Sequence, residues 1–376
     1  MRPAFLLLPI LLLLLLGCAS QTPQQQAPAA SQPAAQPAQN EQGAEPVPST
    51  ESPVQPAQEP ESTEPAESEL PEVLPQQPEP AEPEPETPQT AEPEAPQPPP
   101  QVPELSWQTG GVAIAGKYAD ADVVDLGNGN FRMYYSLEPE AAGFNGQVYS
   151  SVSSDGISWA QEAGTRKEFA TFPSVIKLPD GRYRMYFQNA GIIKSAVSSD
   201  GLTWQDEPGA RMGTENSLGL NFRNVLAPTV INAGSGYLMV YAGAIDERYS
   251  AEMVPNSETH VLLWATSQDG LTFEKKGMAV DSRNSVFKGW LDGPEWVEWD
   301  GGLRLYFWSY AGIYHVTYEA GQFSPTATFD FTTPSDNPMA RFPENPPGDP
   351  TLAKIQGTWF MYYGQHTKGI FYAVYQ

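Results

Sequence analysis

The amino-acid sequence predicts an all-β fold: a five-bladed β-propeller with four antiparallel strands in each blade, over residues 105–376. Three observations lead to this prediction. The motif SVSSDGISW at 151–159 returns as AVSSDGLTW at 196–204 and as ATSQDGLTF at 265–273. The motif ends a longer repeat that occurs five times. Finally, this part of the chain shows no amphipathic helical pattern of three turns.

The five copies of the repeat align on one anchor residue and one residue of the second strand. A short apolar stretch begins at the anchor, and a Met or Leu follows 11 or 12 residues later in a stretch such as YRMYF at 183–187. Copies of this kind at a step of about 50 residues are typical of propeller blades. The anchors are Ala121, Pro173, Pro228, Pro294 and Pro350, and the second-strand residues are Met133, Met185, Met239, Leu305 and Met361.

Each copy is predicted to be a meander of short strands joined by tight turns. Pairs such as Asp180-Gly181 supply the positive φ that tight hairpins need. The repeated nine-residue motif is predicted to form the turn between the third and fourth strands. Its Asp is then a turn residue that caps its own backbone, rather than a ligand-binding residue. These residues are Asp155, Asp200 and Asp269.

The last copy contains only three of its four strands before Gln376. The start of the domain, LSWQ at 105–108, resembles LTWQ at 202–205, which opens a fourth strand. The sequence therefore predicts that the N-terminal strand completes the last blade, which closes the ring and leaves no open sheet edge.

Residues 1–18 are interpreted as a lipoprotein signal peptide. The apolar run that follows Arg2 is too short to span a membrane as a helix. The stretch LLGC at 15–18 resembles the lipobox of bacterial lipoproteins, which implies cleavage before Cys18 and lipid on its sulfur. An ordinary signal peptide is the alternative, but Cys18 is the only cysteine of the chain. We therefore expect a lipid-anchored protein of the bacterial cell envelope, facing outside the cytoplasmic membrane, at the cell surface or on the outer membrane.

Residues 19–104 are predicted to be a disordered linker. They hold 23 of the 39 prolines and are otherwise rich in Glu, Gln and Ala, so they have little to bury. The formal charge of the chain is −25, and residues 105–376 contribute −10 of it. An acidic domain on an acidic linker argues against nucleic acid as a partner and against docking on an anionic membrane surface.

Acidic residues gather where the first strands of the blades begin. In a propeller, these starts share one face with the loops that join second and third strands. The starts of blades four, five and one carry the candidate catalytic residues Asp292, Glu295, Asp349 and Asp120, and Asp122 lies beside the last of these. Crowded carboxylates push their pKa values apart, so that one can stay protonated while another acts as a base.

From its blade count, its strand motifs and its Ser-x-Asp-Gly-x-Thr-Trp endings, the domain resembles the five-bladed propeller glycoside hydrolases of families 32, 43, 62, 68 and 130. The resemblance covers residues 105–376. It implies that Asp120, in ADADVV at 119–124, is the base and that GDPT at 348–351 holds a second functional Asp. DGPE at 292–295 resembles the Glu-Gly-Pro element of the acid, with Asp292 in place of Glu and Glu295 close by. Blades two and three depart from the family pattern, since they offer Phe172 and Ala227.

Aromatic residues near the same face are expected to stack on a sugar ring or to fill the gaps between blades. The candidate substrate-binding residues are Arg223, Trp290, Trp308 and Tyr310, with Trp296 as a further stacking candidate. Two functions are compatible with this pattern: a glycoside hydrolase-like enzyme with axial carboxylates as acid and base, and a non-catalytic propeller that binds a glycan or a protein. Carboxylates facing one another across a pocket would favour the enzyme, whereas acids paired with Arg223 or Arg341 would favour a structural role.

The expected partner is a carbohydrate, with membrane contact only through the lipid anchor and with the protein acting as a monomer. No cofactor is expected. His260, His315 and His366 fall in different blades without zinc spacing, so no metal site is predicted, while calcium in the central channel stays open.

Overall fold

The computed structural model describes residues 106–215, 218–245, 258–334 and 345–376. These residues form 22 β-strands and no helix. No described segment is a helix that is long and apolar enough to cross a membrane. The predicted signal peptide, its Cys18, the predicted linker and Arg341 lie outside the described residues.

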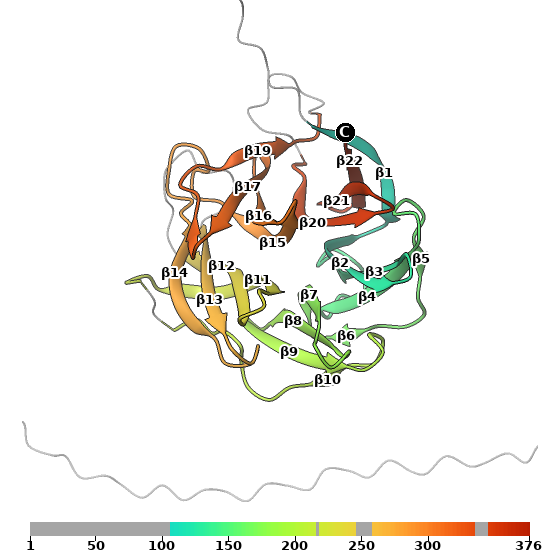
Figure 1. Cartoon of the computed structure of the whole chain (residues 1–376), viewed down its shortest axis with the longest axis horizontal. Helices are drawn as coiled ribbons and strands as arrows, with labels where there is room; N and C mark the ends of the chain where they lie inside the picture. Colours follow the sequence, from blue (N-terminus) through green and yellow to red (C-terminus); the bar gives the residue numbers. More distant parts are fainter. Residues whose placement is uncertain (1–105, 216–217, 246–257, 335–344) are drawn as a thin grey trace, which may run out of the picture. The chain divides into compact units, whose positions relative to one another are not determined.

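The strands form five antiparallel sheets around a central channel, as the sequence predicts (Figure 1). Each sheet is a blade of four strands, numbered here from the channel outward. The first strands are β2 (Tyr118–Gly127), β7 (Thr171–Lys177), β11 (Phe222–Asn232), β15 (Asp292–Trp299) and β20 (Gly348–Ile355). The second strands are β3 (Asn130–Leu137), β8 (Tyr183–Asn189), β12 (Tyr237–Ile245), β16 (Gly302–Ser309) and β21 (Thr358–Gln365). The third strands are β4 (Gln147–Ser153), β9 (Ile192–Ser198), β13 (Thr259–Ser267), β17 (Gly312–Glu319) and β22 (Gly369–Tyr375).

The outer strands are shorter and less regular. Blade 5 takes its fourth strand from the start of the domain, because Trp107 of β1 pairs with Tyr375 of β22 (Figure 1). The predicted closure of the ring by the N-terminal strand is therefore confirmed. Two further short strands, β6 (Lys167–Glu168) and β19 (Thr328–Phe331), pair with β4 and β17. The fourth strands are β5 (Ala160–Gln161), β10 (Gln205–Asp206), β14 (Glu274–Val280), β18 (Gln322–Phe323) and β1 (Trp107–Ala115).

Every first strand contains a bulge at the same place. The residue just before each anchor has a left-handed backbone, with φ between 46° and 54°, and the pairing register shifts there. A bulge of this kind bends the strand and redirects its side chains. The five residues line the narrow waist of the channel. They are Asp120, Phe172, Ala227, Gly293 and Asp349.

A belt of polar side chains ties the blades together just past the bulges. Asp122 Oδ2 accepts a hydrogen bond from the Val175 N–H of the next blade at 2.8 Å. Equivalent bonds run from Val230 N to Ser174 Oγ, from Trp296 N to Thr229 Oγ1 and from Val123 N to Thr351 Oγ1. In blade 4 the belt position is Glu295, whose carboxylate accepts from Thr229 Oγ1 at 3.1 Å and from Thr351 Oγ1 at 3.0 Å.

The repeated nine-residue motif forms a turn that docks on the preceding blade. In each copy the Asp Oδ1 accepts two backbone N–H groups of its own turn at 2.8 Å, which confirms the predicted capping role. The Gly carbonyl then accepts a hydrogen bond from a buried Tyr hydroxyl of the neighbouring second strand. The Tyr–Gly pairs are Tyr362 with Gly156, Tyr134 with Gly201 and Tyr186 with Gly270.

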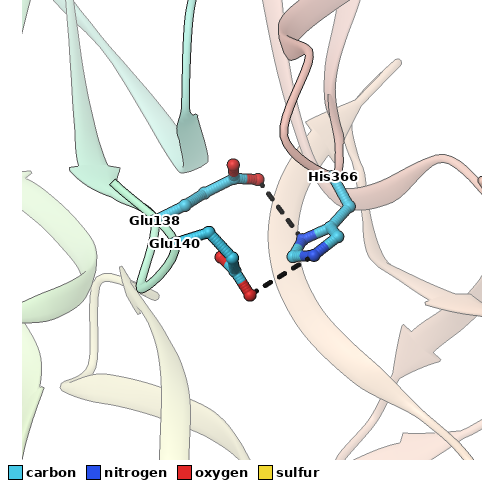
Figure 2. Close-up of side chains that lie close together, drawn as sticks. All are labelled: Glu138, Glu140 and His366. Atoms are coloured by element: carbon cyan, nitrogen blue, oxygen red, sulfur yellow. Dashed lines mark ion pairs between the residues drawn. The ribbon is translucent and has the colours of Figure 1, made fainter. Parts of the chain in front are cut away.

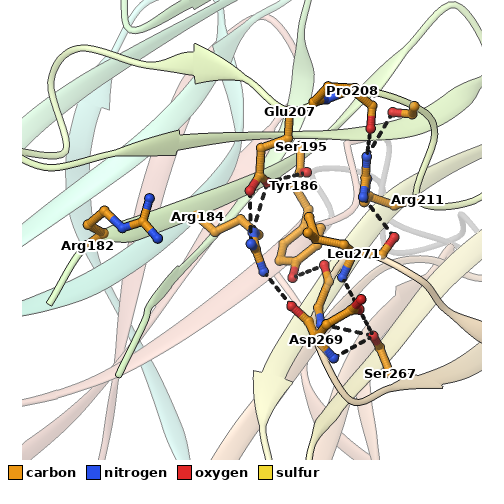
Figure 3. A network of polar contacts seen from close by, with 12 residues as sticks. Arg182, Arg184, Tyr186, Ser195, Glu207, Pro208, Arg211, Ser267, Asp269 and Leu271 are labelled. Carbon is orange, nitrogen blue, oxygen red and sulfur yellow. Dashed lines mark hydrogen bonds and ion pairs between the residues drawn. The ribbon is translucent and has the colours of Figure 1, made fainter. Parts of the chain in front are cut away.

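An arginine reinforces this contact between blades 2 and 3 (Figure 3). Arg184 forms a bidentate ion pair with Glu207, at 2.8 and 2.9 Å, and donates to the Asp269 carbonyl at 3.0 Å. Ser195 Oγ donates to the same carboxylate at 2.7 Å. We call this group of contacts the clasp. Blade 1 repeats the clasp with Arg132 in place of Arg184.

Candidate active site

A cavity of about 470 Å³ opens at one mouth of the central channel. The starts of first strands in blades 1, 2 and 5 line it, together with the ends of second strands and the turns that follow them. This confirms the prediction that these two sets of segments share one face. The volume is typical of small-ligand sites. Its polar and aromatic lining includes Asp120, Glu138, Trp308, Tyr310, Asp349 and His366.

Asp120 is the bulge residue of blade 1 and is half-buried in the cavity lining. Burial raises its pKa to about 7, against hydrogen bonds from the Ser136 hydroxyl and from the Phe172 N–H, and the charges of Asp292 and Glu138 raise it further. Phe172 N lies 3.4 Å from Asp120 Oδ2. Near neutral pH the carboxyl group therefore exists in both protonation states, as an acid–base group requires.

Asp349 is the bulge residue of blade 5, which neighbours blade 1 in the closed ring. Trp308 Nε1 donates a hydrogen bond to Asp349 Oδ1 at 3.0 Å. Burial raises the pKa of Asp349 well above its ordinary value, and the negative charges of Asp120 and Asp292 add to the effect. Since interacting carboxyls of this kind do not both ionise readily, the pair favours holding one proton between its members.

Asp292 lies next to this pair without lining the cavity. It is buried, and it accepts hydrogen bonds from Gly293 N at 2.8 Å and pairs with His260 Nδ1 at 3.1 Å. The His260 ring stacks on Trp290 at a centroid distance of 3.9 Å. Asp292 therefore acts on the cavity through its charge, which raises the pKa of both Asp120 and Asp349.

Glu138 is a third carboxylate of the cavity, and the sequence alone did not single it out. It follows β3 and is 4% exposed, and both of its oxygens accept the Thr367 N–H of blade 5, at 3.0 and 2.8 Å. The His366 ring lies between two carboxylates, with Nδ1 3.6 Å from Glu138 Oε1 and Nε2 3.4 Å from Glu140 Oε1 (Figure 2). Burial raises the pKa of Glu138 despite the Thr367 N–H and the neighbouring His366.

The same three side chains are the one His/Cys/Asp/Glu group in the described ranges whose possible metal-ligating atoms all lie within 4.8 Å of one another. Glu138 is buried, while Glu140 and His366 are exposed. Their ion pairs account for this arrangement without a metal. Calcium in the central channel stays open, as it does from the sequence.

The predicted substrate-binding residues divide into two groups. Trp308 and Tyr310 line the cavity, and Trp290 packs against both, with ring centroids 5.9 and 5.5 Å away. Arg223 lies outside the cavity lining, and its exposed guanidinium is 3.4 Å from Glu258 Oε2. Trp296 is 6% exposed, stacks on Phe323 of the same blade and lies outside the lining of this cavity.

Comparison with known proteins gives the fold a name. No protein-family profile and no curated protein matches the chain. Among solved structures, a glycosyl hydrolase from Bacteroides ovatus is 14% identical with a TM-score of 0.50, over 69% of this chain and 84% of its own. The fold is that of the five-bladed propeller glycoside hydrolases.

Two further five-bladed propeller glycoside hydrolases agree with this fold. A GH43_1 enzyme from Xanthomonas citri is 13% identical with a TM-score of 0.50, over 71% of this chain and 89% of its own. A structure from the GH130 family, described with hydrolases that target β-1,2 mannosidic linkages in Candida mannan, is 13% identical with a TM-score of 0.51, over 74% of this chain and 95% of its own.

One of the predicted catalytic residues, Glu295, lies elsewhere along the channel. Glu295 lines the waist and also a second cavity of about 310 Å³ at the opposite mouth, together with Asp122. Burial raises the pKa of Asp122 to about 7, and burial followed by the charge of Asp122 raises that of Glu295. The carboxyls of the channel thus form two groups: Asp120 and Asp349 at one mouth, and Asp122 and Glu295 in the belt.

Replacing Gly293 with Ala is expected to lower any activity of this site roughly tenfold or more. A Cβ at Gly293 would lie 2.4 Å from Asp349 Oδ1 and 2.6 Å from Asp349 Cα, so the carboxyl group must move. Gly301→Ala is the matched control, because Gly301 also has a positive φ, of 83°, and no atom lies within 4 Å of a Cβ there. Equal losses in the two variants, measured as kcat/KM, would contradict this role of Gly293.

Proposed function

We propose that this protein is a glycoside hydrolase-like enzyme that cleaves an extracellular carbohydrate, with Asp120 and Asp349 as its reacting carboxyls. One observation carries the proposal: two carboxyl groups with raised pKa values line one cavity beside a Trp and a Tyr. Arg223 forms an ion pair with Glu258, at 3.4 Å, rather than with either carboxyl. The five-bladed propeller glycoside hydrolase fold agrees with this reaction class, although fold alone does not fix function.

The surroundings of the two carboxyls suggest which one holds the proton. The negative charges of Asp120 and Asp292 lie near Asp349 and raise its pKa, so Asp349 is the group that stays protonated. Asp120, with a pKa of about 7 and hydrogen bonds from Ser136 and Phe172, ionises first. Asp349 then gives its proton to the oxygen of the leaving sugar, and Asp120 takes a proton from the attacking water.

The aromatic residues of the cavity hold the sugar in place in this proposal. The hydrogen bond from Trp308 to Asp349 fixes the position of the Trp308 ring relative to the Asp349 carboxyl group. Tyr310 packs edge-on against Trp308, with ring centroids 6.0 Å apart. Aromatic rings of this kind cover the apolar face of a sugar while its hydroxyls reach polar groups.

The proposal also includes the location inferred from the sequence. We propose that Cys18 carries the lipid that anchors the protein in a bacterial envelope, outside the cytoplasmic membrane. The domain would then meet its glycan at the end of the linker formed by residues 19–104. Mass spectrometry of the membrane fraction, before and after Cys18→Ser, tests this part by itself.

The activity is tested by incubating the full-length protein with neutral and acidic oligosaccharides and reading the products by mass spectrometry. Release of a shorter glycan supports the enzyme. An inverted anomeric form of the new end agrees with water attack assisted by Asp120, whereas retention would contradict that role of Asp120. A folded protein that binds a glycan but cleaves none would instead be the non-catalytic binding propeller. A protein that neither binds nor cleaves any glycan would overturn both.

The pH dependence of turnover is expected to move when Asp292 is replaced with Asn. Activity should rise as Asp120 loses its proton near pH 7 and should fall at higher pH, as Asp349 loses its own. The charge of Asp292 raises both pKa values, so Asp292→Asn should shift both limbs to lower pH by roughly half a unit or more. Asp125→Asn, at the opposite mouth, should leave the profile in place. Limbs that stay fixed or move to higher pH in Asp292→Asn would contradict the assignment.

A further inference from the structure

The cavity of Asp120 and Asp349 continues into a second hollow over the contact between blades 1 and 2. This hollow measures about 410 Å³ and shares three lining residues with the first: Phe144, Thr171 and Gln188. It is formed by the segment before β4, the segment from β6 to β7 and the turn after β8. We call it the side hollow. A ligand held at the two carboxyls can therefore extend over blades 1 and 2.

The lining of the side hollow combines aromatic rings with carboxamides. Phe144 is 37% exposed and Phe169 is 57% exposed, while Asn145, Gln188 and Asn189 supply amide groups. A sugar offers an apolar face of C–H groups and an edge of hydroxyls, and these two surfaces match aromatic rings and amides. None of the described residues that line the hollow is charged. Its chemistry therefore suits a neutral, hydroxyl-rich ligand.

Phe169 is held in an unfavourable state. Its φ is 55°, in the left-handed region that bulky side chains rarely adopt, and more than half of its side chain faces water. Asn189 Nδ2 donates to the Phe169 carbonyl at 2.7 Å, and Ala170 N donates to the Gly146 carbonyl at 2.9 Å. These bonds fix the segment on both sides. An exposed ring whose backbone is held in one conformation beside a hollow is pre-organised to stack on a ligand there.

We propose that the side hollow binds the sugar next to the one at Asp120 and Asp349, so that the ligand is a neutral oligosaccharide rather than a single sugar. This inference rests on the proposed function and adds the class of substrate to it. Phe169 stacks on the second sugar. The amino group of Gln188 and the amide oxygen of Asn189 hold its hydroxyls, while Gln188 Oε1 keeps its bond from Thr171 and Asn189 Nδ2 keeps its bond to the Phe169 carbonyl. The acidic groups of the first cavity disfavour a uronic acid at the cleavage point for the same electrostatic reason.

The test measures binding by calorimetry, with the full-length protein in an Asp120→Asn background so that no ligand is consumed. The probes are xylo-, arabino-, manno- and gluco-oligosaccharides, from the monosaccharide to the hexasaccharide, with oligogalacturonides as the acidic probe. Phe169→Ala is expected to weaken the binding of the tightest neutral oligosaccharide about tenfold. The affinity for the corresponding monosaccharide should stay unchanged. Leu218→Ala is the matched control, since Leu218 has a φ of 58° and is 54% exposed but lies outside both hollows.

The outcomes separate this inference from the proposed function. If a glycan binds equally to the Phe169→Ala variant and to the parent, the proposed role of the side hollow is wrong, but the proposed function stays intact. Preference for the oligogalacturonides overturns the neutral class of substrate. If no probe binds to a folded protein at all, both proposals fail.

Discussion

Asp120→Asn and Asp349→Asn are each expected to lower kcat by about 10²–10⁴-fold on the glycan that the screen identifies. Asn keeps the shape of the side chain and tolerates the left-handed backbone that both positions require, at φ 54° and 47°. The loss would therefore reflect the missing proton transfer rather than misfolding. Melting curves that match the parent protein confirm this for each variant.

The two variants should differ on an activated substrate. An aryl glycoside with a good leaving group needs little help from an acid, so Asp349→Asn should keep most of its activity there. Asp120→Asn should stay inactive, because water still has to lose a proton. If Asp120→Asn and not Asp349→Asn recovers activity, the two roles are reversed. If neither replacement lowers kcat, the site assignment is wrong, and Glu295→Gln then tests the opposite mouth.

Arg184→Ala is expected to lower the free energy of unfolding by about 3–5 kcal/mol. The side chain of Arg184 is 7% exposed and that of Glu207 is 14% exposed, so the replacement leaves a largely buried carboxylate without its charge partner. The Asp269 carbonyl loses its donor as well. For a domain of this size the melting temperature should fall by roughly 6–20 °C, at about 2–4 °C per kcal/mol.

Arg182→Ala is the matched control for this prediction. Arg182 lies two residues from Arg184 and takes no part in the clasp (Figure 3). It pairs with Asp180, and both side chains are 51% exposed. Solvent screens such a surface pair, so its loss should leave the melting temperature close to that of the parent protein. The double variant Arg184→Met with Glu207→Leu should recover much of the loss, since it leaves no buried charge. Equal melting temperatures for Arg184→Ala and Arg182→Ala would show that the clasp does not stabilise the fold.

The fold could be predicted from the sequence because the repeat occurs five times, once in each blade. The spacing between the anchor and the second-strand Met or Leu fixed the blades, and LSWQ at 105–108 fixed the closure of the ring. The role of Asp155, Asp200 and Asp269 followed from turn chemistry alone. The sequence did not show why the turns need Gly: a Cβ at Gly201 or Gly270 would lie 2.6 Å from an arginine of the preceding blade.

The acids of the channel were harder to sort, because the bulge changes the alternation of side chains. Asp120 and Asp349 come one residue before the anchor of their blade. In blade 4, Asp292 comes two residues before the anchor and Glu295 comes one residue after it. The structure brings the first two into one cavity, sets Asp292 behind them and places Glu295 in the belt. Numbering from the anchor separates these three positions, whereas the DGPE motif alone does not.

Glu138 was missed because its burial depends on a distant segment. It directly follows a second strand, like Tyr310 in blade 4 and His366 in blade 5, so its position on the cavity face could have been read from the repeat. Its burial comes from the Thr367 N–H and from His366, which are more than 200 residues away in the chain. The side hollow was also missed. It depends on the positive φ of Phe169, which the neighbouring sequence does not predict.

The clasps also make the contacts between blades unequal in their response to temperature. The contact between blades 4 and 5 carries no motif turn in the described residues; Arg304 lies over Trp299 instead, which stacks on Trp359 and meets Trp107. Burial of apolar surface carries a large heat-capacity change and weakens on cooling, while buried ion pairs do not share this dependence. Cold should therefore loosen blade 5 against blade 4 before the clasped blades separate. Since Trp308 of blade 4 holds Asp349 of blade 5, such loosening would disturb the proposed acid while most of the propeller remains folded.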